Sequence, residues 1–285
     1  MKMEIAKLQK IINRIVFRLK TILRRIKSIA YVKFRHNPQE VLRVEEDKFE
    51  RTFLYPKNAE KKLNKILMAK YGRTYDQNQD SVHWLLFSAL SNEFQFKKIL
   101  EIGTYDGEFT NILGQLFPDA AIKTVDLPDS DPIVASSYDR ADKEKFSTYS
   151  EKQSKNTKLK NVTCLKTNTL FLLSALEDGE KFDLIWVDGG HLLPDVAWDI
   201  CNAYYLLNEG GFMLCDDVIL SNRYYNNKYV STDSWEVLKY LEERIEHSIT
   251  YFLKRMDPYL YSHDHSRKYV ALLAKKEIVA HEDND

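Results

Sequence analysis

The sequence predicts an α/β fold, a doubly wound and mostly parallel sheet, from three observations. Short apolar segments alternate with helical patterns along most of the chain. The segment Phe182–Val187 is almost wholly apolar, as a strand covered on both faces should be. An earlier apolar run, Ile99–Ile102, leads into two glycines and a helical pattern. These features together predict right-handed strand–helix–strand units within one Rossmann-like, seven-stranded sheet.

The expected elements follow the apolar periodicity. Strands are predicted at residues 99–102, 120–125, 161–165, 182–187, 211–215, 249–253 and 269–273. Helices are predicted at residues 60–71 and 81–92, after Gly107, within 129–156, and at 169–176, 194–207 and 231–246. Residues 37–56 hold a charged run between Pro38 and Pro56 and are expected to be a linker. The predicted regions are a basic helix (1–36), a linker and helical cap (37–79), the sheet domain (80–278) and a polar tail (279–285).

The N-terminal segment differs physically from the rest of the chain. Residues 1–36 hold eleven Lys or Arg and one acid, a net charge of +10 in a chain whose formal charge is zero, so the remainder carries −10. Apolar residues recur at alternating spacings of four and three from Ile5 to Ile29, which predicts a long amphipathic helix.

Three interpretations of this helix remain open. It can lie on an anionic membrane surface, pair with a coiled-coil partner through residues 5–29, or act as a targeting segment. Nucleic acid is disfavoured, because the body is acidic and no recognition motif accompanies the helix. Scattered cysteines without metal-ligand spacing favour a cytoplasmic protein, peripheral at the membrane if the first interpretation holds. The oligomeric state is left open.

The most informative segment is the glycine turn after the first strand. Gly103 and Gly107 have the spacing G-x-x-x-G, whereas dinucleotide binders use G-x-G-x-x-G. Glycine lets the backbone approach a ligand closely, because it has no β-carbon. The turn therefore favours S-adenosylmethionine over a nicotinamide cofactor.

Polar residues follow each later strand of the predicted sheet. In such sheets ligands bind beyond the carboxyl ends of the strands. Asp126 follows the second strand and is expected to accept hydrogen bonds from ribose hydroxyls. Asn168 follows the third and is expected near the adenine edge. The fourth strand is followed by Asp188 and His191, and the fifth ends at the pair Asp216 and Asp217.

Residues of about 80–275 resemble the class I S-adenosylmethionine-dependent methyltransferases. The resemblance implies that Glu101, Gly103, Thr104 and Gly107 contact the cofactor, with Glu101 below its methionine end. The segment 182–218 is similar, more narrowly, to the metal-dependent macrolide sugar O-methyltransferases and to the catechol O-methyltransferase-like enzymes.

This narrower resemblance implies a Mg²⁺ site and a catalytic base. Asp188, Asp216 and Asp217 occupy the positions of the metal ligands, and His191 that of the base in the sugar enzymes. Carboxylates suit Mg²⁺, which can hold vicinal hydroxyls and acidify the attacking one. No lysine stands beside Asp188, so the sequence favours the sugar type over the catechol type.

The predicted function is therefore a Mg²⁺-assisted O-methyltransferase acting on a sugar or polyol hydroxyl, with a small molecule or glycan as acceptor. A nicotinamide-dependent oxidoreductase is disfavoured by the missing third glycine. A non-catalytic, membrane-associated scaffold is disfavoured by the intact acids and histidine at the strand ends. Tyr224 and Tyr225 are candidates for the wall of the acceptor pocket, and His263 and His265 are expected in a solvated hairpin.

Overall fold

A computed structural model describes residues 12–20, 22–23, 26, 30, 33–34, 37–137, 140–220, 231–245, 248–257 and 267–275. The candidate residues Tyr224, Tyr225, His263 and His265 and the predicted tail lie outside this described part of the chain.

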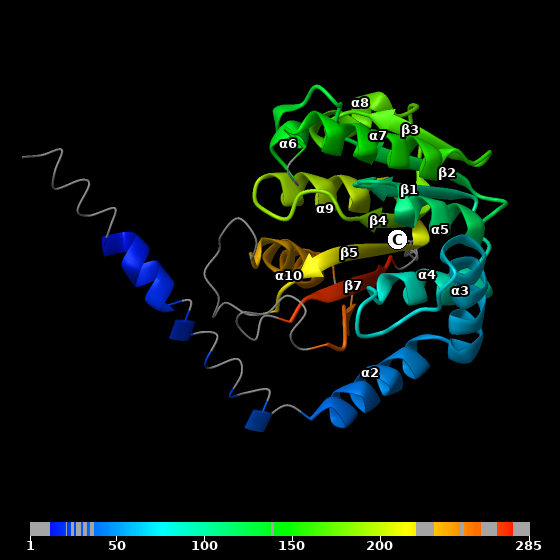
Figure 1. Ribbon diagram of the computed structural model, residues 1–285. Helices are drawn as coiled ribbons and strands as arrows, with labels where there is room; N and C mark the ends of the chain where they lie inside the picture. The colour runs from blue at the N-terminus through cyan, green and yellow to red at the C-terminus, as the bar shows by residue number, and fades with distance from the viewer. Residues whose placement is uncertain are drawn as a thin grey trace, which may run out of the picture.

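The described chain forms one seven-stranded sheet, with the strand order β3-β2-β1-β4-β5-β7-β6 (Figure 1). Its strands are β1 (Lys98–Ile102), β2 (Ala121–Asp126), β3 (Val162–Lys166), β4 (Phe182–Val187), β5 (Leu207–Val218), β6 (Ile249–Leu253) and β7 (Tyr269–Ala274). Strands β1 to β5 pair in parallel, while β7 is antiparallel to both β5 and β6. The predicted fold class, a mostly parallel seven-stranded sheet, is confirmed.

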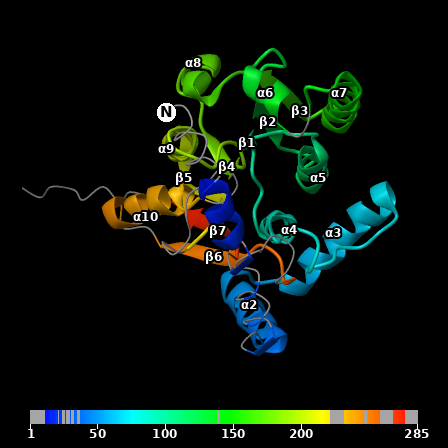
Figure 2. The same cartoon turned by 60° about the vertical axis from the view of Figure 1, so that its left-hand side comes forward.

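Helices cover both faces of the sheet, as the apolar β4 predicts. The helices are α2 (Pro38–Thr52), α3 (Pro56–Tyr71), α4 (His83–Glu93), α5 (Glu108–Leu116), α6 (Pro132–Ser136), α7 (Lys143–Thr157), α8 (Leu172–Ala175), α9 (Asp195–Leu206) and α10 (Asp233–Ile245), with the 3₁₀ turn η1 (Thr169–Phe171). Figure 2 shows α3, α4, α5 and α7 on one side and α8, α9 and α10 on the other. Two apolar cores result, because alternate residues of each strand face opposite sides.

The prediction of a linker over residues 37–56 is wrong. Asn37 caps α2 by accepting a hydrogen bond from the backbone N–H of Glu40, and Pro38 occupies the first turn. Asn-Pro is thus a helix start here, because proline already has a helical φ and needs no N–H at that position. Phe49 of α2 is buried and lies edge-on to Phe252 of β6, 6.2 Å between ring centroids. The helix therefore belongs to the core.

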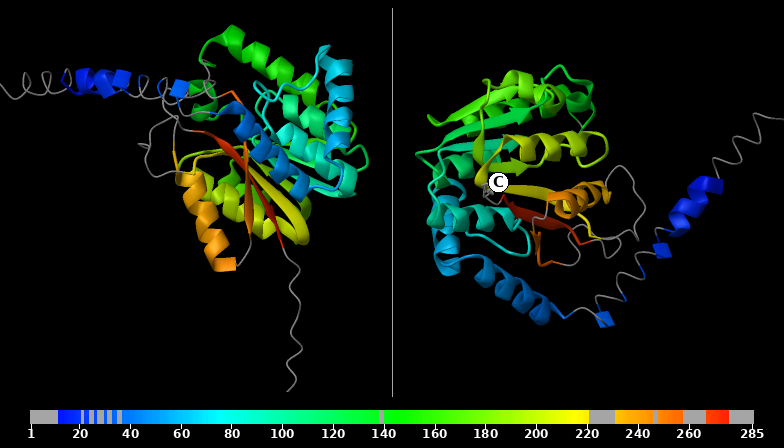
Figure 3. Two further views of the ribbon diagram at one scale, coloured as in Figure 1. Left: turned by 90° about the horizontal axis from the view of Figure 1, so that it is seen from below. Right: turned by 180° about the vertical axis from the view of Figure 1, so that it is seen from behind.

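The N-terminal segment is helical over residues 12–20, and every side chain described there is exposed. Both views of Figure 3 show this helix, in dark blue, standing away from the sheet. Its apolar seam includes Ile12, Ile15 and Leu19, all exposed. None of the helices within the described residues has the length and apolarity needed to cross a bilayer.

The parallel strands bring the predicted site residues to one edge. The backbone N–H of Gly103 donates to the carbonyl of Val125 (2.8 Å), and that of Asp188 donates to the carbonyl of Ile102 (2.8 Å). The ends of β1, β2 and β4 are thereby held level. The turn after β1 and the acids at the carboxyl ends of β2, β4 and β5 consequently lie along the same edge of the sheet.

Candidate active site

The glycine turn between β1 and α5 is required by the protein's own backbone. Gly103 has φ +99°, and a β-carbon there would lie 2.1 Å from the carbonyl oxygen of Asp188. Gly107 has φ +75°, and its β-carbon would lie 3.0 Å from atoms of Asn156 and Thr157 in α7. Both glycines adopt conformations that other residues rarely reach. They let the turn pack against the loop after β4 and against α7, so their spacing reflects this packing as well as the predicted cofactor.

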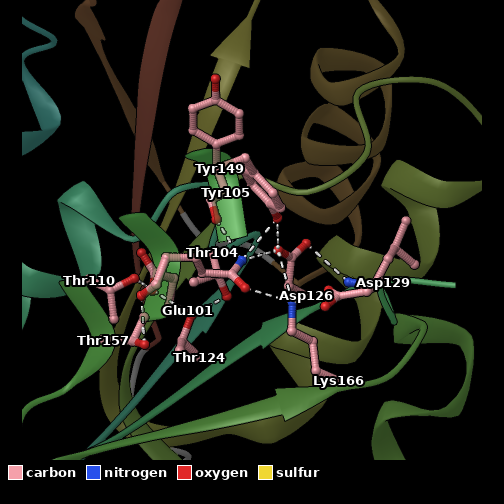
Figure 4. A network of polar contacts seen from close by, with 12 residues as sticks. Glu101, Thr104, Tyr105, Thr110, Thr124, Asp126, Asp129, Tyr149, Thr157 and Lys166 are labelled. Carbon is pink, nitrogen blue, oxygen red and sulfur yellow. Dashed lines mark hydrogen bonds and ion pairs between the residues drawn. The ribbon is translucent and has the colours of Figure 1, made fainter. Parts of the chain in front are cut away.

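Glu101 lies directly beneath this turn and is only 1% exposed. Its Oε2 accepts hydrogen bonds from Thr110 (2.5 Å) and Thr124 (2.6 Å). Thr124 is in turn 2.6 Å from the hydroxyl of Thr104, so a chain of polar contacts runs from Glu101 into the turn (Figure 4). Burial raises the pKa of Glu101 to about 7. Glu101 therefore supports the turn from below: through Thr124 it is connected to Thr104, one of the predicted cofactor-binding residues.

Asp126 lies at the end of β2, as predicted, but protein groups already contact its carboxylate. Oδ2 accepts hydrogen bonds from the Tyr149 hydroxyl (2.9 Å) and the Gln153 amide (2.7 Å), both on α7. Lys166 Nζ lies 4.0 Å from the same oxygen (Figure 4). An ionised carboxylate has about four acceptor sites, so Asp126 can also accept a ribose hydroxyl. Sequence reasoning missed Tyr149 and Gln153, because α7 reaches Asp126 only through the tertiary fold.

Asn168 has a structural role in addition to the one predicted for it. Its side-chain oxygen accepts a hydrogen bond from the backbone N–H of Leu170 (2.9 Å) and so caps η1. Its amide nitrogen can still donate to an adenine edge, and its oxygen has a second lone pair.

His191 faces two of the predicted carboxylates. Its Nε2 lies 3.7 Å from Asp188 Oδ1 and 3.7 Å from Asp217 Oδ2. These distances suit charge attraction but exceed a direct hydrogen bond. Part of the Asp188 side chain remains accessible, yet burial and the adjacent charge of Asp216 raise the pKa of Asp188 well above its usual value. The structure thus brings together the predicted base and the acids after β4 and β5.

Asp199 on α9 holds the loop that carries His191. It is 1% exposed, and its Oδ2 accepts a hydrogen bond from the backbone N–H of Gly190 (2.9 Å). A β-carbon on Gly189 would lie 2.5 Å from the same oxygen, so this loop passes very close to the carboxylate. The sequence carries a signal for Asp199, because it interrupts the apolar face formed by Val196 and Ala203.

A β-bulge in β5 changes how the aspartate pair is presented. Cys215 pairs with Ala271 and Val218 with Tyr269, so β5 has one more residue than β7 between these positions. Asp217 within the bulge has φ +54°. Consecutive side chains of a regular strand point to opposite faces, but here Asp216 and Asp217 both reach one lysine.

That lysine is Lys254, at the end of β6. Its Nζ donates to Asp216 Oδ2, and to Asp217 Oδ1 at 2.6 Å. Lys268, before β7, donates to the other oxygen of Asp217. Burial opposes the charges of Asp216, Asp217 and Lys254, but their mutual attraction prevails: the pKa values of the two aspartates are lowered and that of Lys254 is raised. No local sequence pattern near Asp188 indicates these two lysines, because they lie 37 and 51 positions beyond Asp217.

The donor set in this arrangement does not fit a divalent metal. Two ionised aspartates and two lysines already balance one another, so Mg²⁺ would add an uncompensated double charge. At 4 Å and an effective dielectric of 20, its repulsion from one ammonium is on the order of 8 kcal/mol. Among the described residues, no group of three or more His, Cys, Asp or Glu is placed to hold a metal ion. The Mg²⁺ prediction from Asp188, Asp216 and Asp217 is therefore not supported.

His83 is a buried histidine that the sequence did not indicate. Its ring packs on Trp186 of β4, with 4.5 Å between centroids, and its Nδ1 lies 2.6 Å from the Ser81 hydroxyl. Burial lowers the pKa of His83 to about 3, so the ring is neutral. Within the described part of the chain, its Nε2 and Asp216 Oδ1 are buried atoms without a hydrogen-bond partner.

Comparisons with known proteins agree with this fold. Residues 100–218 match the family model described as a methyltransferase domain. The chain is similar to the O-methyltransferase TomG from Streptomyces achromogenes, involved in tomaymycin synthesis and solved with its cofactor SAM. The two are 17% identical over 77% of this chain and 90% of that chain, with a TM-score of 0.50.

A second similar structure is the O-methyltransferase from Bacillus cereus in complex with SAH. It is 14% identical over 90% of this chain and all of that chain, and its TM-score of 0.46 is lower. A comparison with curated proteins finds no match.

Residues 100–218, which run from β1 to β5, thus match a methyltransferase domain, and the sheet has the arrangement of the class I S-adenosylmethionine-dependent methyltransferase fold.

Proposed function

We propose that this methyltransferase transfers the methyl group to oxygen, on a hydroxyl of a sugar or polyol. The observation that carries the proposal is the position of His191, facing Asp188 and Asp217 at 3.7 Å. The loop after β4 that carries it touches the glycine turn, because the carbonyl of Asp188 occupies the space beside Gly103. This contact supports the proposal of His191 as a base beside the expected cofactor site. TomG, an O-methyltransferase solved with SAM, offers additional support at the level of the fold.

The residues at the carboxyl edge fit S-adenosylmethionine. Asp126 retains acceptor sites for ribose, and Tyr105 is half exposed, with its ring 5.9 Å from that of Tyr149. The turn at Gly103 to Gly107 lets the methionine end approach the backbone. When bound, the sulfonium supplies an electrophilic methyl group and a good thioether leaving group.

The chain's own contribution is to place the acceptor and remove a proton. The acceptor oxygen attacks the methyl carbon in line with the breaking C–S bond, so its orientation supplies much of the acceleration. His191 Nε2 takes the hydroxyl proton. Asp217, whose carboxylate is held ionised by Lys254 and Lys268, lies 3.7 Å from the ring and stabilises the imidazolium that forms. Asp199 keeps the loop in place by bonding to Gly190.

The test combines binding, product analysis and one variant. S-adenosylmethionine should bind in calorimetry, NAD should not, and a panel of sugars, polyols and catechols should yield an O-methylated sugar or polyol by mass spectrometry. His191→Gln should lower kcat by about 100-fold or more without changing cofactor affinity. Lys239→Gln, an exposed ion-pair residue on α10, serves as the control. Absence of cofactor binding would refute the function, and unchanged kcat in the histidine variant would refute the base.

We further infer that the N-terminal helix attaches the enzyme to an anionic membrane surface. Ile12, Ile15 and Leu19 form an exposed apolar seam, and Arg14 and Arg18 are exposed among them. Such a helix lies in the interface with its apolar face inserted and its cations on the headgroups. The protein should co-sediment with phosphatidylserine vesicles. It should not co-sediment with phosphatidylcholine vesicles, and the Ile15→Glu variant should not co-sediment with either. Dimerisation without vesicle binding would instead indicate a coiled-coil partner.

A further inference from the structure

The predicted metal ligands are organised by an internal cation, and we propose that Lys254 takes the place of a divalent metal in this active site. The inference deepens the proposed function and rests on it for the identity of the reaction. Metal binding can nevertheless be measured without any methyl transfer.

Lys254 is held in place like a structural cation. Its side chain is only 10% exposed, and its ammonium donates to Asp216 and Asp217 together. The backbone around it is also tied down: its N–H donates to the carbonyl of Lys268 (2.8 Å), and its carbonyl accepts from the N–H of Val82 (2.9 Å). The position of the ammonium is thus set by the β6–β7 ladder and by the start of α4.

The β-bulge makes one lysine sufficient for two acids. Without the extra residue in β5, Asp216 and Asp217 would point to opposite faces of the sheet. Asp217 has a left-handed φ of +54°, which few residues other than glycine adopt, and a lysine binds each oxygen of its carboxylate. The bulge and the lysines therefore form one arrangement, with the cation at its centre.

The consequence for the site is the orientation of Asp217. Lys254 binds Oδ1, and the other oxygen, bound by Lys268, lies 3.7 Å from His191 Nε2. Lys254 is thus a positioning residue: it directs Asp217 towards the base, as a metal would direct its ligands. The acceptor hydroxyl is then activated by His191 alone, without metal coordination.

The test titrates the whole protein with Mn²⁺ and follows the electron paramagnetic resonance signal of the free ion. Mn²⁺ prefers the same oxygen ligands as Mg²⁺. The wild type should show no binding tighter than about 1 mM. Lys254→Met should bind Mn²⁺ at least about 10-fold more tightly, because Asp216 and Asp217 lose the cation that they share. Lys254→Arg keeps the positive charge and should behave like the wild type. Lys123→Met is the second control: it removes a lysine of β2 that pairs with Glu180, away from the aspartate pair, and should also behave like the wild type.

The wild-type titration decides the proposal even if the Met variant does not fold. Tight Mn²⁺ binding that Asp216→Asn abolishes would overturn it, and so would a folded Met variant with unchanged Mn²⁺ affinity. Failure of the proposed function is distinguishable, because it appears as absent cofactor binding or absent O-methylated product. O-methylation that persists in excess EDTA would support both the proposed function and the role of Lys254. O-methylation that requires a divalent metal would uphold the proposed function and refute the role of Lys254.

Discussion

The buried carboxyl of Glu101 predicts a specific dependence of stability on pH. In the folded protein its pKa is about 7, whereas the ordinary value is 4.5. The stability that its protonation contributes is fully present below about pH 4.5 and is lost as the pH rises through about 7. This rise in pKa corresponds to about 3 kcal/mol in the free energy of unfolding, of which about 2.5 kcal/mol falls between pH 5 and pH 8.

Glu101→Gln isolates this contribution. The amide is close in shape, and its oxygen can accept both threonine hydrogen bonds, but it does not titrate. Urea unfolding of the wild type and the variant at pH 5 and pH 8 should show that the variant gains about 2.5 kcal/mol relative to the wild type at the higher pH.

Glu180→Gln is the matched control. Glu180 is also buried, but its pKa is lowered by Lys123, although burial alone would raise it. Its stabilisation is therefore lost only as the pH falls below about 4.5, so the difference from the wild type should stay constant between pH 5 and pH 8. Equal differences at both pH values for Glu101→Gln would refute the reasoning, because Glu101 would then be ionised at no cost.

Two further predictions concern the cofactor edge. Asp126→Asn should weaken S-adenosylmethionine binding about 10-fold or more in calorimetry, because an amide accepts fewer hydrogen bonds from ribose. The control variant Asp119→Asn, at an exposed position, should leave the affinity unchanged. Equal affinities in both variants would exclude Asp126 from the ribose site. Gly103→Ala should cost about 3 kcal/mol or more in unfolding free energy, because its β-carbon would strike the carbonyl of Asp188. Gly179→Ala, at φ +72° in open space, should cost only about 1–2 kcal/mol, and equal costs in thermal melts would argue against the clash.

The elements that the sequence predicted well depend on local patterns. The apolar runs at β1 and β4 and the glycines after β1 are legible because strand burial and turn geometry are encoded within a few residues. The acids at the carboxyl ends of β2, β4 and β5 were also found this way, since parallel strands bring their carboxyl ends to one edge. The sequence thus determined the fold class, and the methyltransferase resemblance agrees with the domain matched over residues 100–218.

Helix α2 shows where local interpretation failed. The charged residues around Pro38 suggested a linker, whereas the packing of Phe49 on Phe252, about 200 positions away, makes the segment part of the core. Long-range burial of this kind leaves little trace in the composition of the segment itself.

The tertiary structure alone decided the chemistry of the aspartate pair. Asp216 and Asp217 match metal ligands in sequence, and nothing near them along the chain suggests otherwise. Their partners, Lys254 and Lys268, lie 37 and 51 positions beyond Asp217. They arrive through the antiparallel pairing of β7 between β5 and β6 and through a bulge that aims both acids at one ammonium. Whether a carboxylate binds a metal or a lysine depends on which cation lies beside it in the folded protein. Contacts between distant segments of the chain decide this.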